Sequence, residues 1–240
     1  MKTDMTGRVA LITGAGGGIG RALTKRFHEM GMRLALVGRS ENKLIAAAED
    51  AGCQDALILS GDLTDPEFLT GVADTVYNHF ADLDVLVNNA GVCFVKPMEE
   101  TTYEELDLIM KTNVYAPYML CKCAVPILRL SDCPTIINMG SVVSHKGYPT
   151  QSAYSTAKHA LLGMTRALAA EVYRDGIRVH ILCPGAVHTR MAETVSRPDI
   201  DMNALIETED IADAAEYLLT HRGNAVIDEI QMHRVGKQPF

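Results

Sequence analysis

The sequence predicts an α/β fold in which helices cover both faces of a mostly parallel sheet of about seven strands. Two observations lead to this prediction. Short apolar runs rich in Val, Ile and Leu alternate along the chain with longer segments of helical pattern, and such alternation is typical of parallel sheets. The 240 residues, 48% of them hydrophobic, can build one large core and contain no linker-like or repetitive stretch. We therefore expect a single domain over residues 1–240.

The opening of the chain forms a unit that can be assigned element by element. Arg8-Val-Ala-Leu-Ile-Thr13 is a short, β-rich apolar run and is expected to be a buried strand. Glycines crowd residues 14–20, a helix is expected over 21–30, and a second strand over 33–37. Strand, glycine loop, helix and strand make a βαβ unit of the dinucleotide-binding kind, so a Rossmann-like, doubly wound domain is predicted.

The same alternation continues to the end of the chain. Further strands are expected at 56–60, 84–88, 135–139, 177–183 and 225–232. Further helices are expected at 41–51, 66–80, 103–130, 152–173 and 210–220. In such a sheet, ligands bind beyond the carboxyl ends of the strands. Residues that directly follow the strands should therefore gather at one edge.

Composition and charge argue against several kinds of partner. The net charge is −8 and no dense run of Lys and Arg occurs, so nucleic acid is not expected. Every apolar run is too short to span a bilayer, and the N-terminus lacks the apolar region of a signal peptide; we expect no membrane partner and a cytoplasmic location. The six cysteines form no Cys-x-x-Cys and the eight histidines show no metal-ligand spacing, so reduced thiols and no metal are expected.

Two Tyr-x-x-x-Lys pairs occur, each able to place a phenol and an ammonium on one helix face. Tyr154 and Lys158 lie in the helix that follows the loop after Ser141, close to the predicted binding edge, whereas Tyr118 and Lys122 lie in the middle of a helix. A nearby positive charge lowers the pKa of a tyrosine toward working pH. The position of the pairs therefore favours Tyr154 as an acid or base.

The glycine loop has the spacing Gly14-x-x-x-Gly18-x-Gly20 between the first strand and the first helix. Glycines there let backbone N–H groups approach a pyrophosphate. The second strand ends in Gly38-Arg39, where an acid would bind the ribose of NAD and an arginine suits the 2′-phosphate of NADP. The sequence favours NADP, with NAD as the alternative, in which Arg39 stacks on adenine or faces solvent and Glu41 takes the ribose.

Assembled in order, these segments resemble the short-chain dehydrogenase/reductase family in its single-domain branch. The resemblance covers residues 8–190 and is carried by Thr13-Gly-Ala-Gly-Gly-Gly-Ile-Gly20, Asn88-Asn-Ala-Gly91, Asn113, Ser141, Tyr154 with Lys158, and Pro184-Gly-Ala-Val-His-Thr189.

The resemblance implies an NAD(P)-dependent oxidoreductase that transfers a hydride between nicotinamide and a carbonyl or secondary alcohol. It implies that Tyr154 is the general acid or base, that Lys158 holds the nicotinamide ribose and lowers the pKa of Tyr154, that Ser141 orients the substrate oxygen, and that Asn113 supports a proton-relaying water chain. The cofactor residues that it implies, besides Tyr154 and Lys158, are Gly14, Gly18, Ile19, Gly20, Arg39, Asp62, Leu63, Asn89, Ala90, Gly91, Pro184, Gly185, Val187 and Thr189.

Within the family, the middle of the chain is similar to 3-oxoacyl-acyl-carrier-protein reductases and related carbonyl reductases. The region from about 189 to 207, which would form a substrate lid, is shorter than in those enzymes, and this puts an acyl-carrier-protein substrate in doubt. Mostly apolar residues beside the motifs favour a small hydrophobic carbonyl or alcohol as substrate. The substrate-binding candidates, in addition to Ser141, are Cys93, Val143, Tyr148, Ala186 and Met191, with Phe94 beside them.

Two alternatives and an assembly state accompany this interpretation. A cofactor-sensing binding protein of the same fold would normally lack the catalytic residues, and a sugar-nucleotide epimerase would need a larger C-terminal part than the roughly fifty residues after Thr189. The helices at 103–130 and 152–173 are apolar on more than one face. Family likeness and these faces imply a homo-oligomer, a tetramer or a dimer.

Overall fold

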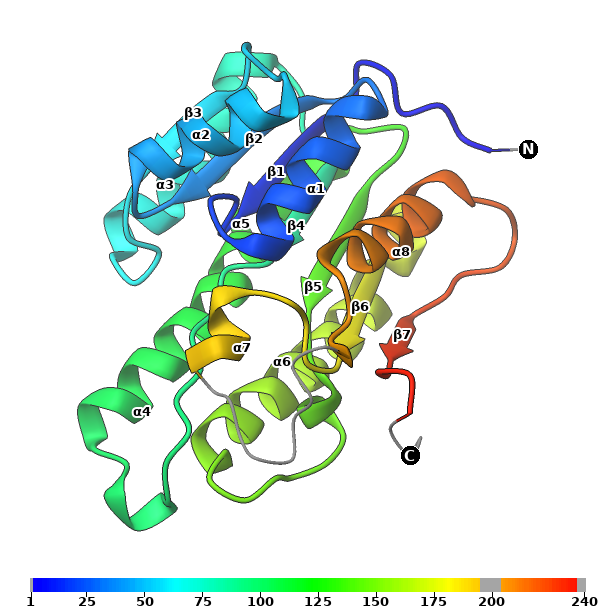
Figure 1. The fold of residues 1–240 in the computed structure, drawn as a ribbon. Coiled ribbons are helices and arrows are strands. Elements are labelled where there is room, and N and C mark those ends of the chain that lie inside the picture. The colour runs from blue at the N-terminus through cyan, green and yellow to red at the C-terminus, as the bar shows by residue number, and fades with distance from the viewer. Residues whose placement is uncertain (1, 195–203, 237–240) are drawn as a thin grey trace.

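Seven parallel strands form one sheet in the order β3-β2-β1-β4-β5-β6-β7 (Figure 1). The computed structural model describes residues 2–194 and 204–236. The strands are β1 (Val9–Thr13), β2 (Arg33–Gly38), β3 (Leu57–Ser60), β4 (Val85–Asn88), β5 (Thr135–Met139), β6 (Arg178–Pro184) and β7 (Glu229–Met232). The predicted α/β class and the Rossmann-like, doubly wound parallel sheet are confirmed.

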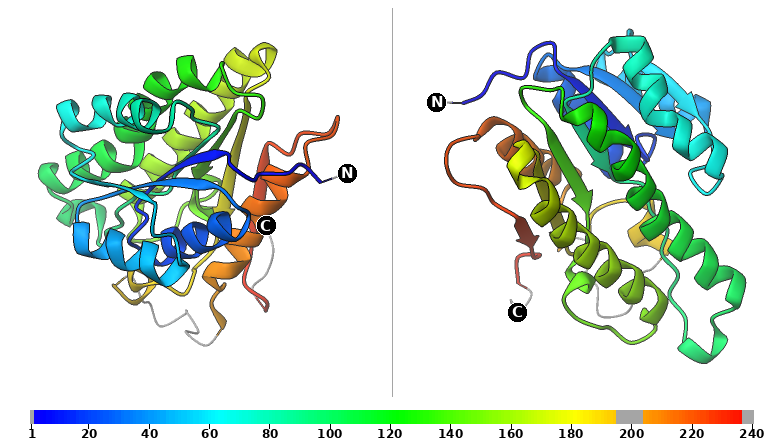
Figure 2. Two further views of the ribbon diagram at one scale, coloured as in Figure 1. Left: turned by 90° about the horizontal axis from the view of Figure 1, so that it is seen from above. Right: turned by 180° about the vertical axis from the view of Figure 1, so that it is seen from behind.

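Helices cover the sheet on both sides, as Figure 2 shows from above. One layer contains α1, α2 and α8, and the other contains α3, α5 and α6. No helix in the described part of the chain combines the length and apolar character that crossing a membrane requires. The helices are α1 (Gly18–Glu29), α2 (Glu41–Ala51), α3 (Pro66–Phe80), α4 (Tyr103–Met110), α5 (Ala116–Leu128), α6 (Ser152–Val172), α7 (Arg190–Thr194) and α8 (Thr208–Thr220).

The strands form because their residues are apolar on both faces. All five residues of β1 are buried, and so are all those of β4 and β5. Successive side chains point to opposite sides of the sheet, so Leu11 joins the core under α3 and α5 whereas Ile12 joins the core under α1 and α8. This two-sided burial explains why continuous apolar runs predicted the strands correctly.

The helix expected over 103–130 is interrupted by a π-helical turn, Lys111–Tyr115, between α4 and α5. The turn contains Asn113, which is buried and points away from the helix toward the chain after β4. Its side chain donates to the carbonyl of Val92 at 2.8 Å and accepts from the N–H of Val92 at 2.9 Å. π-turns are frequent at functional sites. This one directs the side chain of Asn113 to the backbone of Val92.

The last strand is shorter than expected, since β7 begins at Glu229 rather than near 225. The preceding loop wraps around Arg178, whose guanidinium donates to the carbonyls of His221, Gly223 and Ala225. These carbonyls bind the arginine, so the segment forms a loop instead of an extension of β7.

Candidate functional site

A cavity of about 520 Å³ lies beyond the carboxyl ends of the strands, where the sequence predicted that ligands bind. Apart from Phe94, every residue expected to hold cofactor or substrate lines it. These are Gly14, Gly18, Ile19, Gly20, Arg39, Asp62, Leu63, Asn89, Ala90, Gly91, Cys93, Ser141, Val143, Tyr148, Tyr154, Lys158, Pro184, Gly185, Ala186, Val187, Thr189 and Met191. Of the expected lid at 189–207, residues 195–203 lie outside the described residues.

The glycine loop is closely packed against its neighbours. Gly14 has φ +65°, and a Cβ on it would lie 2.9 Å from Cα of Ala90; a Cβ on Gly18 would lie 2.7 Å from Cγ2 of Thr189. Position 14 therefore requires glycine, and a side chain at position 18 would have to displace that of Thr189. The first turn of α1 lines the cavity and contains no acidic residue. A helix N-terminus with free backbone N–H groups is a site that suits a phosphate, so the loop fits the pyrophosphate of a dinucleotide.

Hydrogen bonds from β1 to the chain after β4 hold the floor of the cavity. The hydroxyl of Thr13 accepts from the N–H groups of Asn89 and Ala90, each at 3.0 Å. The side chain of Asn89 donates back to the carbonyls of Thr13 at 2.9 Å and Gly14 at 3.3 Å. The glycine loop and the Asn-Ala-Gly segment are thus fixed relative to each other.

One end of the cavity is positively charged. Arg39 follows β2, and Lys43 lies in the first turn of α2, where its Cβ would be 2.9 Å from a Cβ placed on Gly16. Asp62 faces the same end and accepts from Thr64 N–H at 2.8 Å. That bond lowers the pKa of Asp62, and the charge of Arg39 lowers it further. Lys43 was not predicted as a site residue; its signal in the sequence was a lysine in the helix turn directly after Arg39.

The catalytic candidates meet at the other end. Ser141 follows β5, and Tyr154 and Lys158 come from the first two turns of α6. The ammonium of Lys158 donates to the carbonyl of Met139 at 2.6 Å and lies 5.7 Å from the centroid of the Tyr154 ring. The Ser141 hydroxyl donates to the carbonyl of Pro184 at 3.4 Å. Hydroxyl, phenol and ammonium are therefore held on one side of the cavity.

Burial shifts the pKa values of Tyr154 and Lys158 in the directions that favour the neutral form of each group. Desolvation raises the pKa of Tyr154 above its ordinary value, against a weaker opposing effect of a hydrogen bond with Ser141. Desolvation also lowers the pKa of Lys158 to about 8. A lowered pKa for Tyr154 was expected from the resemblance; in this structure the tyrosine pKa is raised, because the loss of water around the phenol outweighs the hydrogen bond with Ser141.

Asn113 does not line the cavity, unlike the other catalytic candidates. Its two bonds to the backbone of Val92 hold the segment that continues from Gly91. A Cβ on Gly91 would lie 3.2 Å from Oδ1 of Asn113 and 3.9 Å from Nζ of Lys158. The asparagine is therefore adjacent to the lysine across a glycine.

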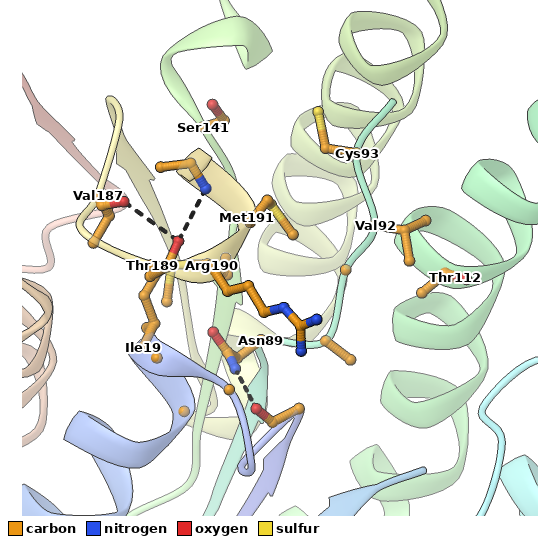
Figure 3. A pocket seen from close by; sticks show the side chains of 18 of the residues that line it. Ile19, Asn89, Val92, Cys93, Thr112, Ser141, Val187, Thr189, Arg190 and Met191 are labelled. Atoms are coloured by element: carbon orange, nitrogen blue, oxygen red, sulfur yellow. Dashed lines mark hydrogen bonds between the residues drawn. The ribbon is translucent and has the colours of Figure 1, made fainter. Parts of the chain in front are cut away.

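The expected substrate residues line the region beside Ser141 and Tyr154, and the charged residue Arg190, which was not predicted from the sequence, lines the cavity as well. Figure 3 shows Arg190 extending from α7 into the cavity, on the side of Asn89, while Cys93 and Met191 lie at the walls. Burial raises the pKa of the Cys93 thiol to about 11. Phe94 packs beside Ile109 instead of lining the cavity. Arg190 had no signal beyond its place directly after Thr189.

The second Tyr-x-x-x-Lys pair lies outside the site. Tyr118 is 56% exposed on α5, Lys122 is also exposed, and neither lines the cavity. The pair that lies near the strand ends, Tyr154 and Lys158, is thus the pair that faces the cavity.

With this geometry established, comparison with known proteins identifies the family. The family model described as short chain dehydrogenase matches residues 8–199. The chain belongs to the short chain dehydrogenase family and is thus a member of an oxidoreductase family. It is similar to the 3-oxoacyl-[acyl-carrier-protein] reductase of Bos taurus, with 33% identity over 216 residues, which cover 88% of this chain and 91% of that protein.

Two solved structures illustrate the likeness of the fold. A 3-ketoacyl-(acyl-carrier-protein) reductase from Brucella melitensis, complexed with NADH, has a TM-score of 0.88 and 28% identity, and the match covers 97% of this chain and 98% of that one. A metagenomic short-chain oxidoreductase in complex with NADP has a TM-score of 0.83 and 28% identity, and the match covers 96% and 98%. Related structures thus include one with each nicotinamide cofactor.

Proposed function

We propose that the protein is an NADP(H)-preferring oxidoreductase that reduces a small carbonyl compound or oxidises the corresponding alcohol. One observation supports this above all: Ser141, Tyr154 and Lys158 line the same cavity as the glycine loop and the first turn of α1. A dinucleotide with its pyrophosphate at that helix N-terminus reaches along the cavity toward the phenol. When bound, the nicotinamide supplies or accepts the hydride.

The side chains of the chain handle the oxygen and the proton. The Ser141 hydroxyl orients the substrate oxygen, and the Tyr154 phenol gives it a proton during reduction. A raised pKa keeps Tyr154 protonated at neutral pH, which is the state that a general acid needs. Lys158 holds the ribose hydroxyls and passes protons on toward solvent. Asn113 holds the backbone of Val92, and thereby the adjacent Gly91, in place.

The preference for NADP rests on two cations, Arg39 and Lys43, at the end of the cavity where the adenine part of the cofactor would lie, here called the adenine end. Arg39 and Lys43 both line the cavity there, and Asp62 is the one carboxylate among its described lining residues. Arginine pairs well with phosphate oxygens, and lysine adds a point charge. A 2′-phosphate fits such a pair better than two ribose hydroxyls do.

The alternative is a binding protein that senses NAD(P) without turnover. The presence of Ser141, Tyr154 and Lys158 on one cavity argues against it, because a binding protein has no need for a phenol beside a buried ammonium. The proposed substrate is small and mostly hydrophobic, matching Cys93, Val143 and Met191 in the cavity wall. Because the guanidinium of Arg190 can bind a carboxylate, an assay panel should also include keto acids.

The test is reduction of a panel of ketones, aldehydes and keto acids with NADPH and NADH side by side. For any active substrate, Tyr154→Phe should lower kcat by about a hundredfold to ten-thousandfold, the usual contribution of a positioned acid. NADPH binding, followed by its fluorescence, should be unchanged. Tyr118→Phe is the matched control and should leave turnover intact. Equal turnover of Tyr154→Phe and the unmodified protein would disprove the proposal.

A further inference from the structure

His145, Cys183 and Glu229 converge behind the catalytic candidates although they are far apart in the sequence. His145 follows the 3₁₀ turn Val142–Ser144, Cys183 lies near the end of β6, and Glu229 begins β7. One ligand atom from each residue, a ring nitrogen, a sulfur and a carboxylate oxygen, lies within 4.8 Å of the other two. None of these three residues lines the cavity described above.

The contact between the histidine and the glutamate joins two atoms that cannot both be acceptors. Nε2 of His145 is in direct contact with Oε1 of Glu229. That oxygen is buried and has no hydrogen-bond partner among the described residues. A carboxylate oxygen is only an acceptor, and an unprotonated ring nitrogen is an acceptor as well. Two acceptors in contact are stable only if a proton or a metal ion lies between them.

The third group distinguishes these two cases. Cys183 is buried, and its sulfur lies beside the same two atoms. Burial raises the pKa of this thiol to about 12, against the weaker effect of hydrogen bonds from the backbone of Ser141 and the hydroxyl of Ser144, so the sulfur is a thiol until a cation displaces its proton. A shared proton would involve His145 and Glu229 alone, whereas a metal ion would also take the sulfur beside them as a ligand.

We propose that His145, Cys183 and Glu229 bind a divalent transition-metal ion, with Zn²⁺ as the ion that fits best. Nitrogen, sulfur and carboxylate oxygen are the donors that zinc takes in proteins, and three protein ligands leave a fourth position for water. A tetrahedral zinc ion keeps its ligand atoms about 3.3 to 3.6 Å apart. The cluster reaches this spacing when the contact between His145 and Glu229 widens and the sulfur moves closer.

The charges at the site balance. A thiolate and a carboxylate neutralise the two positive charges of the ion, and the thiol proton of Cys183 leaves to solvent on binding. The neighbouring cation, Arg166, lies 3.5 Å from the other oxygen of Glu229 and is mostly exposed, so it can turn toward water. His145 and Glu229 are partly exposed, with 25% and 19% of their side-chain surface accessible, and this gives the ion a path from solvent.

The position of the site links it to Ser141. The carbonyl of Pro184, the residue after Cys183, accepts from the Ser141 hydroxyl at 3.4 Å. The hydroxyl of Ser144, the residue before His145, accepts from the Ser141 N–H at 3.2 Å. A bound ion therefore stabilises the turn that carries Ser141 from the side opposite the substrate. This inference does not depend on the proposed reaction, because it concerns residues outside the cavity.

The experiment is a titration of the full, chelator-treated protein with Co²⁺, a spectroscopic substitute for Zn²⁺. We expect one equivalent to give visible bands of a tetrahedral site and a near-ultraviolet band from sulfur-to-cobalt charge transfer, both removed by one equivalent of Zn²⁺. Cys183→Ser should lose the charge-transfer band. His145→Gln should weaken binding at least tenfold, since even residues that only orient ligands change affinity by about that factor.

Cys53→Ser is the matched control, because Cys53 is also a buried thiol but lies outside the cluster. Its spectrum should match that of the unmodified protein. Because Cys183→Ser alters the core, circular dichroism checks its fold, and the partly exposed His145→Gln gives an independent result if that fold is lost. Absence of any charge-transfer band in the unmodified protein, or an unchanged affinity in His145→Gln, would overturn the proposal and leave a direct contact between His145 and Glu229.

Discussion

Tyr154 and Lys158 illustrate how burial sets the chemistry of single residues. Both are held where water is scarce, so the phenol is a weaker acid and the ammonium a stronger acid than in solution. The phenol therefore stays protonated through the physiological range. In contrast, the pKa of the Lys158 ammonium, lowered to about 8, lies close to the physiological range.

This difference predicts a pH dependence for reduction. Since the pKa of Lys158 is lowered to about 8, its charge is present below that pH and is lost as the pH rises through it. We expect kcat/KM for carbonyl reduction to fall on the alkaline side of about pH 8. Lys158→Arg, which keeps its charge, should have lower activity but no such decline. A profile of the unmodified enzyme that stays flat to about pH 10 would contradict this assignment.

The two cations at the adenine end predict a change of cofactor preference. Arg39→Ala should raise the KM for NADPH about tenfold to a hundredfold, since a hydrogen bond to a charged group contributes about 1.5 to 3 kcal/mol. Lys43→Ala should have a smaller effect of the same sign, and the KM for NADH should change little in either variant.

Lys25→Ala is the control for these variants, because Lys25 lies on α1 and does not line the cavity. Steady-state kinetics with both cofactors measure the effect. If Arg39→Ala weakens NADH and NADPH equally, the arginine stacks on the adenine instead of binding the phosphate.

At the scale of elements, a buried polar chain fixes the helix that carries Tyr154. Asn88 of β4 donates to Asn138 of β5 at 2.8 Å, and Asn138 donates to Thr165 of α6 at 2.9 Å. The Thr165 hydroxyl then donates to the carbonyl of Leu161 at 2.7 Å. The residues are buried, so each bond is made away from competing water.

Removing the middle of that chain should loosen the attachment of α6. Asn138→Ala leaves buried polar groups on Asn88 and Thr165 without their partner, at a cost of about 1 to 3 kcal/mol in the free energy of unfolding. Urea unfolding measures the change. Thr75→Val is the control, because the hydroxyl of Thr75 bonds the carbonyl of Gly71 at an exposed site on α3. An Asn138→Ala protein as stable as the control would show that packing alone holds α6.

Elements differed in how well the sequence predicted them, for physical reasons. Strands such as β4 and β5 are buried on both faces. Their short apolar runs therefore predicted buried strands directly. The π-turn at Lys111–Tyr115 escaped prediction because its residues have ordinary helical character; the bonds of Asn113 to Val92 define it. The start of β7 was misplaced because Arg178, distant in sequence, binds the carbonyls before it.

The whole molecule brings together what the sequence could only list. Cofactor and substrate candidates were predicted because they follow strand ends, and the topology of a parallel sheet gathers such residues without further information. Lys43 and Arg190 were missed because their direction depends on the turns of α2 and α7. The meeting of His145 with Cys183 and Glu229 was missed because ligand spacing along the chain gives no sign of it.

The outer surface suggests an assembly, and we propose that the protein is a homo-oligomer. Several large apolar side chains are exposed around α4 and α5, namely Tyr103, Leu106, Tyr115 and Tyr118. Exposed aromatic groups of this kind often mark an interface. Light scattering should give a mass that is a multiple of the protomer mass.

The double variant Tyr115→Glu/Tyr118→Glu should shift the protein toward the monomer, because two charges would have to be buried at the interface. Tyr217→Glu, on the exposed part of α8, should not shift it. A monomeric mass for the unmodified protein would reject the homo-oligomer.

The order of the strands has a consequence for how the chain is made. The first three strands and β4 complete the part of the sheet around β1, and β5, β6 and β7 are then added one after another at the same edge. A chain growing on the ribosome therefore presents an unpaired edge, first of β4, then of β5 and then of β6, until the next strand has been made, and such an edge attracts other chains. We expect translation that stalls before β6 to yield an aggregating fragment, and a chaperone to be needed most during the final third of synthesis.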